Sequence, residues 1–192
     1  MYRLDNLQKR DFAARFIQLY CFAFWDKDTP EVLVRLMKAW GHMVNKLRGF
    51  DPDLQFDITE EFVWWLNAYH YPSTGFVGRH HKVGIQDYIN DKVPFTESVA
   101  FLSKVGEDFK TGGLYLGKRG HDDSEMHYIE PYIDWGDVLL FVNDLHHEIK
   151  PIDPDKPVDL DPMRNRFILD LTSVSMEAVR KYFSVEIGRS HV

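Results

Sequence analysis

The sequence predicts a mostly β fold, an antiparallel sandwich or barrel with flanking α-helices packed outside it. Two observations lead to this prediction. Apolar residues near the N-terminus recur at the three- and four-residue spacing of helices, whereas the chain beyond Asp51-Pro52 consists of short β-branched and aromatic runs separated by turn formers. We expect one domain over residues 1–192, with a helical N-terminal support over 1–50 and a β-core over 51–192.

Two N-terminal helices are expected. The first spans Leu4 to Phe24, because its apolar residues fall on one helical face. The second begins at Thr29-Pro30, an N-cap residue followed by proline at the first helical position, and ends near Gly49. At the other end of the chain, Met176 to Phe183 is compatible with a short helix or with the lead-in to a last strand.

Five short runs are typical of strands, and no long helix lies between them. They are Phe62–Trp65, Ser98–Leu102, Gly113–Leu116, Val138–Val142 and Arg166–Leu171. The absence of interleaved helices favours antiparallel sheets over a βαβ arrangement. The segment Asp153 to Asn165 is rich in Asp and Pro and is expected to be an exposed loop.

Composition excludes several classes of function. A hydrophobic content of 44% is high enough for a packed core, and a net charge of −7 argues against a protein that tracks nucleic-acid phosphates. Cys21 is the single cysteine, so any metal must be held by His, Asp or Glu. We find no signal-peptide core and no apolar run of about 18 residues, and we expect a cytoplasmic protein without membrane or nucleic-acid partners.

Three segments carry candidate chemistry in a defined order. The first is Tyr71-Pro72-Ser73-Thr74-Gly75-Phe76, which leads to His80. The second joins a Gly136-Asp137 turn and an apolar run to His147-Glu148-Ile149-Lys150-Pro151, and the third is the arginine-led run that starts at Arg166. A Gly-Gly-Leu run at Gly112-Gly113-Leu114 lies between the first two. This order over Tyr71 to Leu171 resembles that of the iron(II)/2-oxoglutarate dioxygenases.

The resemblance implies a fold, a site and cofactors. It implies a double-stranded β-helix, also called a jelly roll or cupin-like barrel. His80 and His147 would bind Fe(II), and the Arg166 guanidinium would pair with the far carboxylate of the cosubstrate 2-oxoglutarate, because its planar fork matches a carboxylate. The implied activity is the oxidation of a small-molecule substrate, and a homodimer is compatible with it.

One position departs from the family pattern. A His-x-Asp or His-x-Glu motif normally completes two histidines with a carboxylate, but here the motif is His80-His81-Lys82. Starting the motif at His81 places Val83 at the carboxylate position instead. Lys82 is therefore a candidate catalytic residue in its own right.

Several interpretations of Lys82 stay open. Water or a halide could fill the vacant metal position, or another carboxylate could replace the missing one, with Asp87, Asp91 and Glu148 nearest in sequence. Alternatively, metal binding is weak and the fold serves as a binding protein or as an enzyme that uses Lys82 as a nucleophile or base. A third hypothesis is a protein-interaction subunit, which a large exposed apolar patch would favour.

Overall fold

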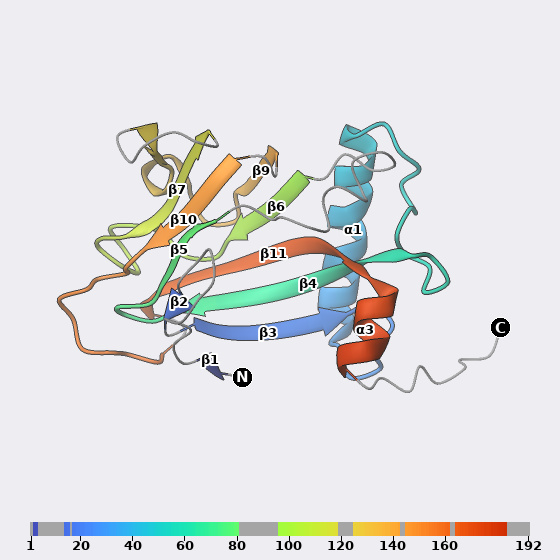
Figure 1. The fold of residues 1–192 in the computed structure, drawn as a ribbon, viewed down its shortest axis with the longest axis horizontal. Helices are drawn as coiled ribbons and strands as arrows, with labels where there is room; N and C mark the ends of the chain where they lie inside the picture. The colour runs from blue at the N-terminus through green and yellow to red at the C-terminus, as the bar shows by residue number, and fades with distance from the viewer. Residues whose placement is uncertain are drawn as a thin grey trace. The chain divides into compact units, whose positions relative to one another are not determined.

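The computed structural model describes residues 2–3, 14–15, 17–80, 96–118, 125–142, 145–161 and 164–183 (Figure 1). The chain forms two compact units, one of residues 1–20 and 67–170 and one of residues 21–66 and 171–192. Three strands, β3 (Ile17–Ala23), β4 (Phe62–Tyr71) and β11 (Arg166–Ser175), contribute residues to both units. The expectation of a single domain stays a prediction. No helix in the described segments is long and apolar enough to cross a membrane.

The strands form two sheets. One sheet has six strands in the order β1-β3-β4-β11-β6-β9, with β1 at Tyr2–Arg3, β6 at Thr96–Phe101 and β9 at Val138–Val142. The other has five strands in the order β2-β5-β10-β7-β8. Its members are β2 (Ala14–Arg15), β5 (Phe76–His80), β10 (Leu145–Lys150), β7 (Gly113–Lys118) and β8 (His127–Tyr128), and Figure 1 shows β5, β10 and β7 side by side.

The strand order is that of a jelly roll. If β4 to β11 are counted as strands one to eight, the larger sheet contains the order 1-8-3-6 and the smaller sheet the order 2-7-4-5. Neighbouring strands therefore come from distant parts of the sequence, as two interlocked Greek keys require. The pairs β5 with β10, β10 with β7, and β6 with β9 are antiparallel. The prediction of a mostly β, antiparallel, jelly-roll-like fold is confirmed at this level.

The unit of residues 1–20 and 67–170 has one apolar core. It is built from alternate residues of its strands, because every second side chain of a strand points to the same face. Its fully buried members, Phe101, Phe109 and Ile152, show no solvent exposure. The other buried members of the cluster are Tyr71, Val77, Val99, Leu114, Leu116, Phe141, Ile149 and Ile168.

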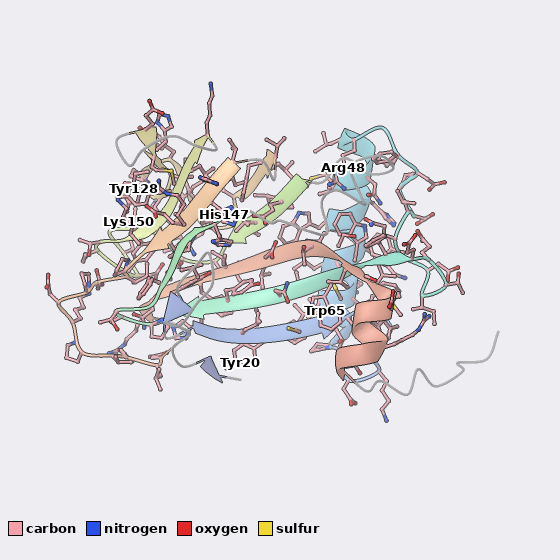
Figure 2. The ribbon with its side chains drawn as sticks, in the orientation of Figure 1. Tyr20, Arg48, Trp65, Tyr128, His147 and Lys150 are labelled. Carbon is pink, nitrogen blue, oxygen red and sulfur yellow. The ribbon has the colours of Figure 1, made fainter. Side chains whose placement is uncertain are left out.

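The unit of residues 21–66 and 171–192 contains two helices, α1 (Glu31–Leu47) and α3 (Met176–Phe183). The buried face of α1 includes Met37, Trp40 and Val44, and its polar Asn45 donates from Nδ2 to the carbonyls of Pro52 and Leu54. A cluster around Trp65, labelled in Figure 2, forms the core of this unit. Its other buried members are Ala23, Val63, Met176 and Val179.

The first expected N-terminal helix is wrong where the structure describes it. Ile17–Ala23 is strand β3, and the short strands β1 and β2 also lie in this part of the chain, whereas residues 4–13 lie outside the described residues. The seven-residue run Ile-Gln-Leu-Tyr-Cys-Phe-Ala fits helical spacing and strand propensity alike. Hydrogen bonding to the neighbouring strands of the larger sheet decides between them. Among the described residues before Asp51, one α-helix is present instead of the two expected.

The other element predictions are confirmed with small shifts. The second helix exists, but Pro30 is its N-cap and Glu31 its first residue, one position later than expected. It ends at Leu47, and Gly49 follows with a φ of +78°. Four of the five predicted strands lie within an observed strand, and the fifth, Ser98–Leu102, extends one residue beyond the end of β6 at Phe101. The open choice at Met176–Phe183 is settled as helix α3. The described part of the Asp153 to Asn165 segment contains no strand or α-helix.

Asp153 anchors that loop to the preceding chain. Its Oδ1 accepts the backbone N–H groups of Lys110 and Thr111, both at 2.8 Å, and its Oδ2 pairs with the Lys156 ammonium. Burial alone would raise the pKa of Asp153, but the Lys156 ion pair and these N–H groups together lower it. Because the folded pKa lies below the unfolded one, this carboxylate stabilises the fold above the unfolded value and loses its contribution as the pH falls through the folded value.

We expect Asp153→Asn to lower the free energy of unfolding by about 1 to 3 kcal/mol near neutral pH, because a charged acceptor of several hydrogen bonds is lost. Urea unfolding measures the change. The matched control is Asp155→Asn, an exposed aspartate of the same loop, which should change stability by no more than about 0.5 kcal/mol. Equal stabilities of the two variants would contradict the anchoring role.

Candidate functional site

A β-bulge in β5 turns a histidine toward its partner on β10. His147 pairs with His80, and Ile149 pairs with Val77. Ile149 lies two positions after His147, whereas Val77 lies three positions before His80, so β5 has one extra residue between these pairs. Without it, Val77 and His80 would point to opposite faces of the sheet. With it, both lie opposite residues of the same face of β10.

The two imidazoles lie against each other at the apolar core. Their ring centroids are 4.1 Å apart, and the His147 ring packs edge-on to Phe141 at 5.5 Å. His147 is only 8% exposed. The structure therefore brings together the two histidines that the sequence singled out.

Both imidazoles direct the same nitrogen toward their own strand. His80 Nδ1 lies 2.9 Å from the Gly78 carbonyl oxygen, and His147 Nδ1 lies 3.4 Å from that of Leu145. A carbonyl can only accept a hydrogen bond, so in the neutral ring Nδ1 carries the proton and Nε2 has the lone pair. Histidines that bind metals commonly use this arrangement, because the carbonyl fixes the tautomer and the ring orientation.

A buried carboxylate approaches the histidine pair from the other sheet. Glu97 Oε2 on β6 lies 3.6 Å from His147 Nε2, and Glu97 is 4% exposed. In the register of the larger sheet, Glu97 lies opposite Phe141, the residue that packs on the His147 ring. The predicted pair of imidazoles thus has an acidic neighbour that the sequence analysis did not identify.

Glu148 does not take that position. It alternates with His147 along β10 and so belongs to the opposite face, where its carboxylate lies 3.8 Å from both the Arg79 and Lys150 cationic nitrogens. On the same face Lys150 lies over the Tyr115 ring, which stacks on Tyr128 (Figure 2). The expectation that Glu148 could supply the missing carboxylate is therefore not supported. Asp87 and Asp91 lie outside the described residues.

Arg166 is a fully buried guanidinium at the start of β11. It shows no solvent exposure, and its Nε donates to Glu130 Oε1 at 2.6 Å. The guanidinium lies over the rings of Tyr71 and Phe101, with centroid distances of 5.2 and 5.6 Å. Its Nη1 and Nη2 are buried without a hydrogen-bond partner among the described residues. The Nη1 and Nη2 groups of the planar Arg166 guanidinium are thus available to donate hydrogen bonds to an anion.

The backbone of β7 fixes the position of the Glu130 side chain. Its Oε1 also accepts the N–H of Leu114 at 2.8 Å, and it is 1% exposed. Gly113 has a φ of +108°, and a Cβ atom there would come within 2.3 Å of Glu130 Cγ. Only glycine combines this backbone conformation with so close an approach. Gly113 therefore makes room for the carboxylate that orients Arg166.

Tyr71 lies in the same interior as these charges. Burial raises the pKa of Tyr71 to about 12, although the nearby Arg166 guanidinium lowers it and the carboxylates of Asp170, Glu97 and Glu130 raise it further. The phenol therefore stays neutral at physiological pH.

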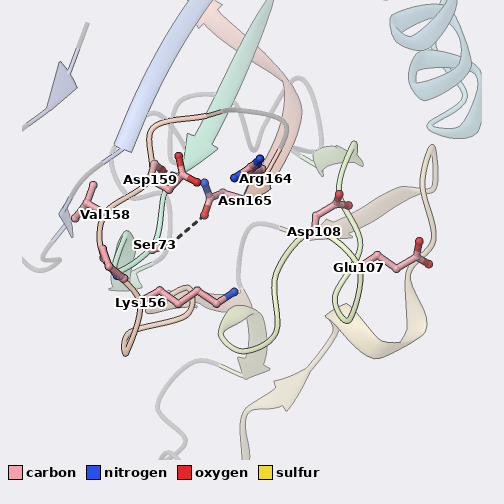
Figure 3. Close-up of a pocket in the computed structure, with 9 residues that line it drawn as sticks. Ser73, Glu107, Asp108, Lys156, Val158, Asp159, Arg164 and Asn165 are labelled. Carbon is pink, nitrogen blue, oxygen red and sulfur yellow. Dashed lines mark hydrogen bonds between the residues drawn. The ribbon is translucent and has the colours of Figure 1, made fainter.

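A separate polar cavity of about 490 Å³ lies between the loops near Glu107 and Asp159 (Figure 3). Its walls include Lys156, Arg164 and Asn165, and the Ser73 hydroxyl donates to Asn165 Oδ1 at 3.2 Å. None of His80, His147, Glu97 and Arg166 lines it. We place the candidate site at the histidine pair, because that is where buried ionisable groups converge.

Of the predicted site residues, His80, His147 and Arg166 are described, and Lys82 and His81 lie outside the described residues. Sequence reasoning missed Glu97 and Glu130. Glu97 could have been found from its alternation with Val99 and Phe101, which places a charge in a row of core residues. Glu130 precedes a proline in a 3₁₀ turn, Glu130–Tyr132, and no sequence pattern links it to Arg166.

The donor set fits iron(II) and an oxo-acid in part. Two imidazole Nε2 atoms and a nearby carboxylate are the ligand types of non-haem iron sites, and the buried Nη1 and Nη2 of Arg166 suit a carboxylate. In the described part of the chain, however, no three His, Cys, Asp or Glu side chains are grouped closely enough to hold a metal ion as they stand.

Comparison with known proteins supports the fold. No family model and no curated protein matches the chain. A crystal structure of a prolyl-4-hydroxylase from Pseudomonas putida is similar, with a TM-score of 0.53 and 18% sequence identity over 84% of this chain and 73% of that one. At this identity the likeness concerns the fold alone, an oxygenase-like jelly roll.

We expect Glu130→Gln to destabilise the protein by about 3 to 5 kcal/mol, because it leaves the Arg166 charge buried without a counter-ion while keeping an oxygen for the Leu114 N–H. Urea unfolding of the variant measures this loss. The double variant Glu130→Gln/Arg166→Met should lose clearly less, since it removes the uncompensated charge. A double variant as unstable as the single one would show that the ion pair is not the cause.

Proposed function

We propose that the protein is an iron(II)- and 2-oxoglutarate-dependent oxygenase that oxidises a small organic molecule. The proposal is supported by the jelly-roll strand order, by the similarity to a prolyl-4-hydroxylase and by the chemistry of the interior groups. The observation that carries it is the pairing of His80 with His147, 4.1 Å apart across the bulge, in the same unit as a buried Arg166 with two open donors.

Each residue has a distinct role in the proposal. His80 and His147 bind the metal through Nε2, with Nδ1 directed to the Gly78 and Leu145 carbonyls. Arg166 receives the far carboxylate of 2-oxoglutarate on Nη1 and Nη2, while Glu130 holds its Nε and fixes the plane of the fork. When bound, iron and 2-oxoglutarate would allow dioxygen to act as the oxidant: one oxygen atom would go to the oxo-acid, which loses CO₂ and becomes succinate, and the other to the substrate.

The apolar surroundings would serve the same chemistry. Tyr71, Phe101 and Phe141 line the interior next to these groups, so a bound anion or metal would be shielded from water. Electrostatic attraction between the guanidinium and a carboxylate is stronger in such surroundings than in water. The neutral Tyr71 phenol can offer a hydrogen bond without adding charge.

We expect 2-oxoglutarate-dependent succinate formation in the presence of Fe(II), and its loss in His147→Ala. The matched control is His146→Ala, which removes the neighbouring imidazole on the opposite face of β10 and should keep most of the activity. Succinate is measured by chromatography after anaerobic loading with iron and exposure to air. Wild-type protein that binds no divalent metal and forms no succinate would refute the proposal.

We expect Arg166→Lys to weaken 2-oxoglutarate binding by roughly 10- to 100-fold, equivalent to one charge-assisted hydrogen bond. Lysine keeps a cation beside Glu130 but loses the planar fork. Calorimetric titration of Mn(II)-loaded protein measures the affinity. Arg164→Lys makes the same chemical change at an exposed arginine that pairs with Asp161, and it should leave the affinity unchanged. Equal weakening by both variants would remove Arg166 as the anchor.

A further inference from the structure

The helix α1 has a second apolar surface besides the one that it buries. Its inner face includes Met37, Trp40 and Val44, which lie in the core of its unit. Four other large apolar side chains of the same helix are between 38 and 67% exposed: Val32, Leu36, Met43 and Leu47. Large apolar side chains gathered on one exposed surface indicate an interaction site, whereas a single exposed one does not.

These side chains form a stripe along the helix. Together with Ala39, which is also exposed, they follow one another at spacings of four, three, four and four residues. Residues at these spacings lie on one side of a helix, and alternating spacings of three and four form the seam between two paired helices. The α1 stripe, Val32 to Leu47, is roughly 22 Å long at about 1.5 Å per residue. A helix of similar length would match it.

A row of cations runs along one side of the α1 stripe. Arg35, Lys38 and Lys46 each directly precede a residue of the stripe, so they lie on the same side of it. All three are exposed, and their side chains have no ion-pair partner among the described residues. His42 belongs to the same row, and its Nε2 lies 2.9 Å from Asp53 Oδ1. The row thus already has one carboxylate beside it and has three cations available for others.

The charge of α1 is opposite to that of the whole chain. The helix has three cationic side chains and a single anionic one, Glu31, whereas the chain has a net charge of −7. An apolar stripe beside unpaired cations is complementary to an apolar stripe beside carboxylates, because unlike charges guide the approach and fix the register of the two surfaces. Charge complementarity therefore favours an acidic amphipathic helix as the occupant.

Two other occupants fit less well. In an antiparallel pair with a second copy of α1 the apolar residues would match, but Arg35 and Lys38 of both copies would gather near the middle of the seam. Like charges that face each other across an interface oppose binding. A bilayer surface favours a helix with a broad apolar face that includes aromatic residues, whereas the α1 stripe is narrow and has none.

We propose that the exposed side of α1 binds a helix of another protein. This partner helix presents apolar residues to the α1 stripe and acidic residues to Arg35, Lys38 and Lys46. The stripe supplies the apolar area that the complex buries, and the cations select the partner and its orientation. The surface includes none of the residues of the candidate site, so the inference does not depend on the proposed function.

A synthetic helix serves as the probe. It has about three heptads with leucine at both seam positions and glutamate beside them, and a second peptide has lysine in place of each glutamate. Fluorescence anisotropy measures the binding of the 192-residue chain to each labelled peptide. We expect the glutamate peptide alone to bind, and more weakly as the salt concentration rises, because salt screens exposed charges. Equal binding of the two peptides would overturn the inference.

Charge reversal tests the cationic row. Arg35→Glu/Lys38→Glu should weaken binding of the glutamate peptide by about 10-fold or more, because two attractions become repulsions. The matched control is Lys27→Glu/Lys118→Glu, which changes the net charge equally at two exposed lysines outside α1. The control should bind almost as the wild type does. Equal weakening by both double variants would reduce the effect to net charge and would contradict the proposal.

Polar substitution tests the stripe. Leu36→Ser/Met43→Ser should lose binding of the glutamate peptide, because it removes the apolar contact at the centre of the seam. The matched control is Val158→Ser/Leu160→Ser, two loop residues of similar exposure, and it should bind as the wild type does. Circular dichroism checks that both variants fold. Should Leu36→Ser/Met43→Ser not fold, the charge-reversal pair decides by itself.

The other occupants give different results, and each of these results overturns the inference. Cosedimentation with vesicles of phosphatidylserine and phosphatidylcholine, without binding of the glutamate peptide, would assign the stripe to a membrane surface. A dimer in analytical ultracentrifugation that dissociates in Leu36→Ser/Met43→Ser would assign it to a second copy. A large loss of stability in that variant, with no peptide bound by the wild type, would show that the chain itself covers the stripe.

Discussion

The candidate site depends on one extra residue in β5. A strand pairs residue by residue with its neighbour, so its side chains keep a strict alternation between two faces. Val77 packs in the apolar cluster, so its side chain defines the core-facing side of β5. His80 lies three positions later, and strict alternation would direct its side chain away from the core. The bulge between Val77 and His80 reverses the alternation at that point. It brings His80 opposite His147 while the anchoring of Val77 stays intact.

Two buried carboxylates of this unit, Glu130 and Glu97, differ in the groups that surround them. Glu130 is paired with a guanidinium and a backbone N–H, so its charge is compensated by the protein itself. Glu97 lies beside a histidine at a distance too long for a hydrogen bond. Burial raises the pKa of Tyr71 to about 12, and both carboxylates raise it further, so its phenol stays neutral at physiological pH. The same unit thus contains a buried Arg166–Glu130 ion pair and a second buried carboxylate, Glu97, beside His147.

The sequence predicted the β-core well because its strands have strong local signals. Val138–Val142 is observed with the predicted bounds, and the turn at Gly136 has the φ of +83° that glycine favours. The resemblance in motif order implied that His80 and His147 meet at one site, and the structure pairs them across β5 and β10. The order of strands in the sheets could not be read from local signals, since β4 and β11 are neighbours from distant parts of the chain.

The failures have physical causes as well. Helical spacing in Ile17–Ala23 was overridden by pairing within a sheet, which satisfies the backbone groups of a short segment as well as a helix does. Glu97 and Glu130 act through contacts with residues 50 and 36 positions away, and no spacing rule reaches that far. The third position of the expected metal motif, Lys82, lies outside the described residues, so its role stays a prediction.

The short strand β2 has a consequence for how the chain can be divided. Ala14 and Arg15 pair with Val77 and Phe76, so they cover the free edge of the strand that bears His80. An uncovered edge exposes main-chain donors and acceptors that can recruit a strand from another molecule. Trimming the chain to the β-rich portion after residue 50 would uncover that edge. Ala14 and Arg15 thus protect the edge of the sheet that bears the histidine pair, and a protein shortened in this way would be prone to self-association.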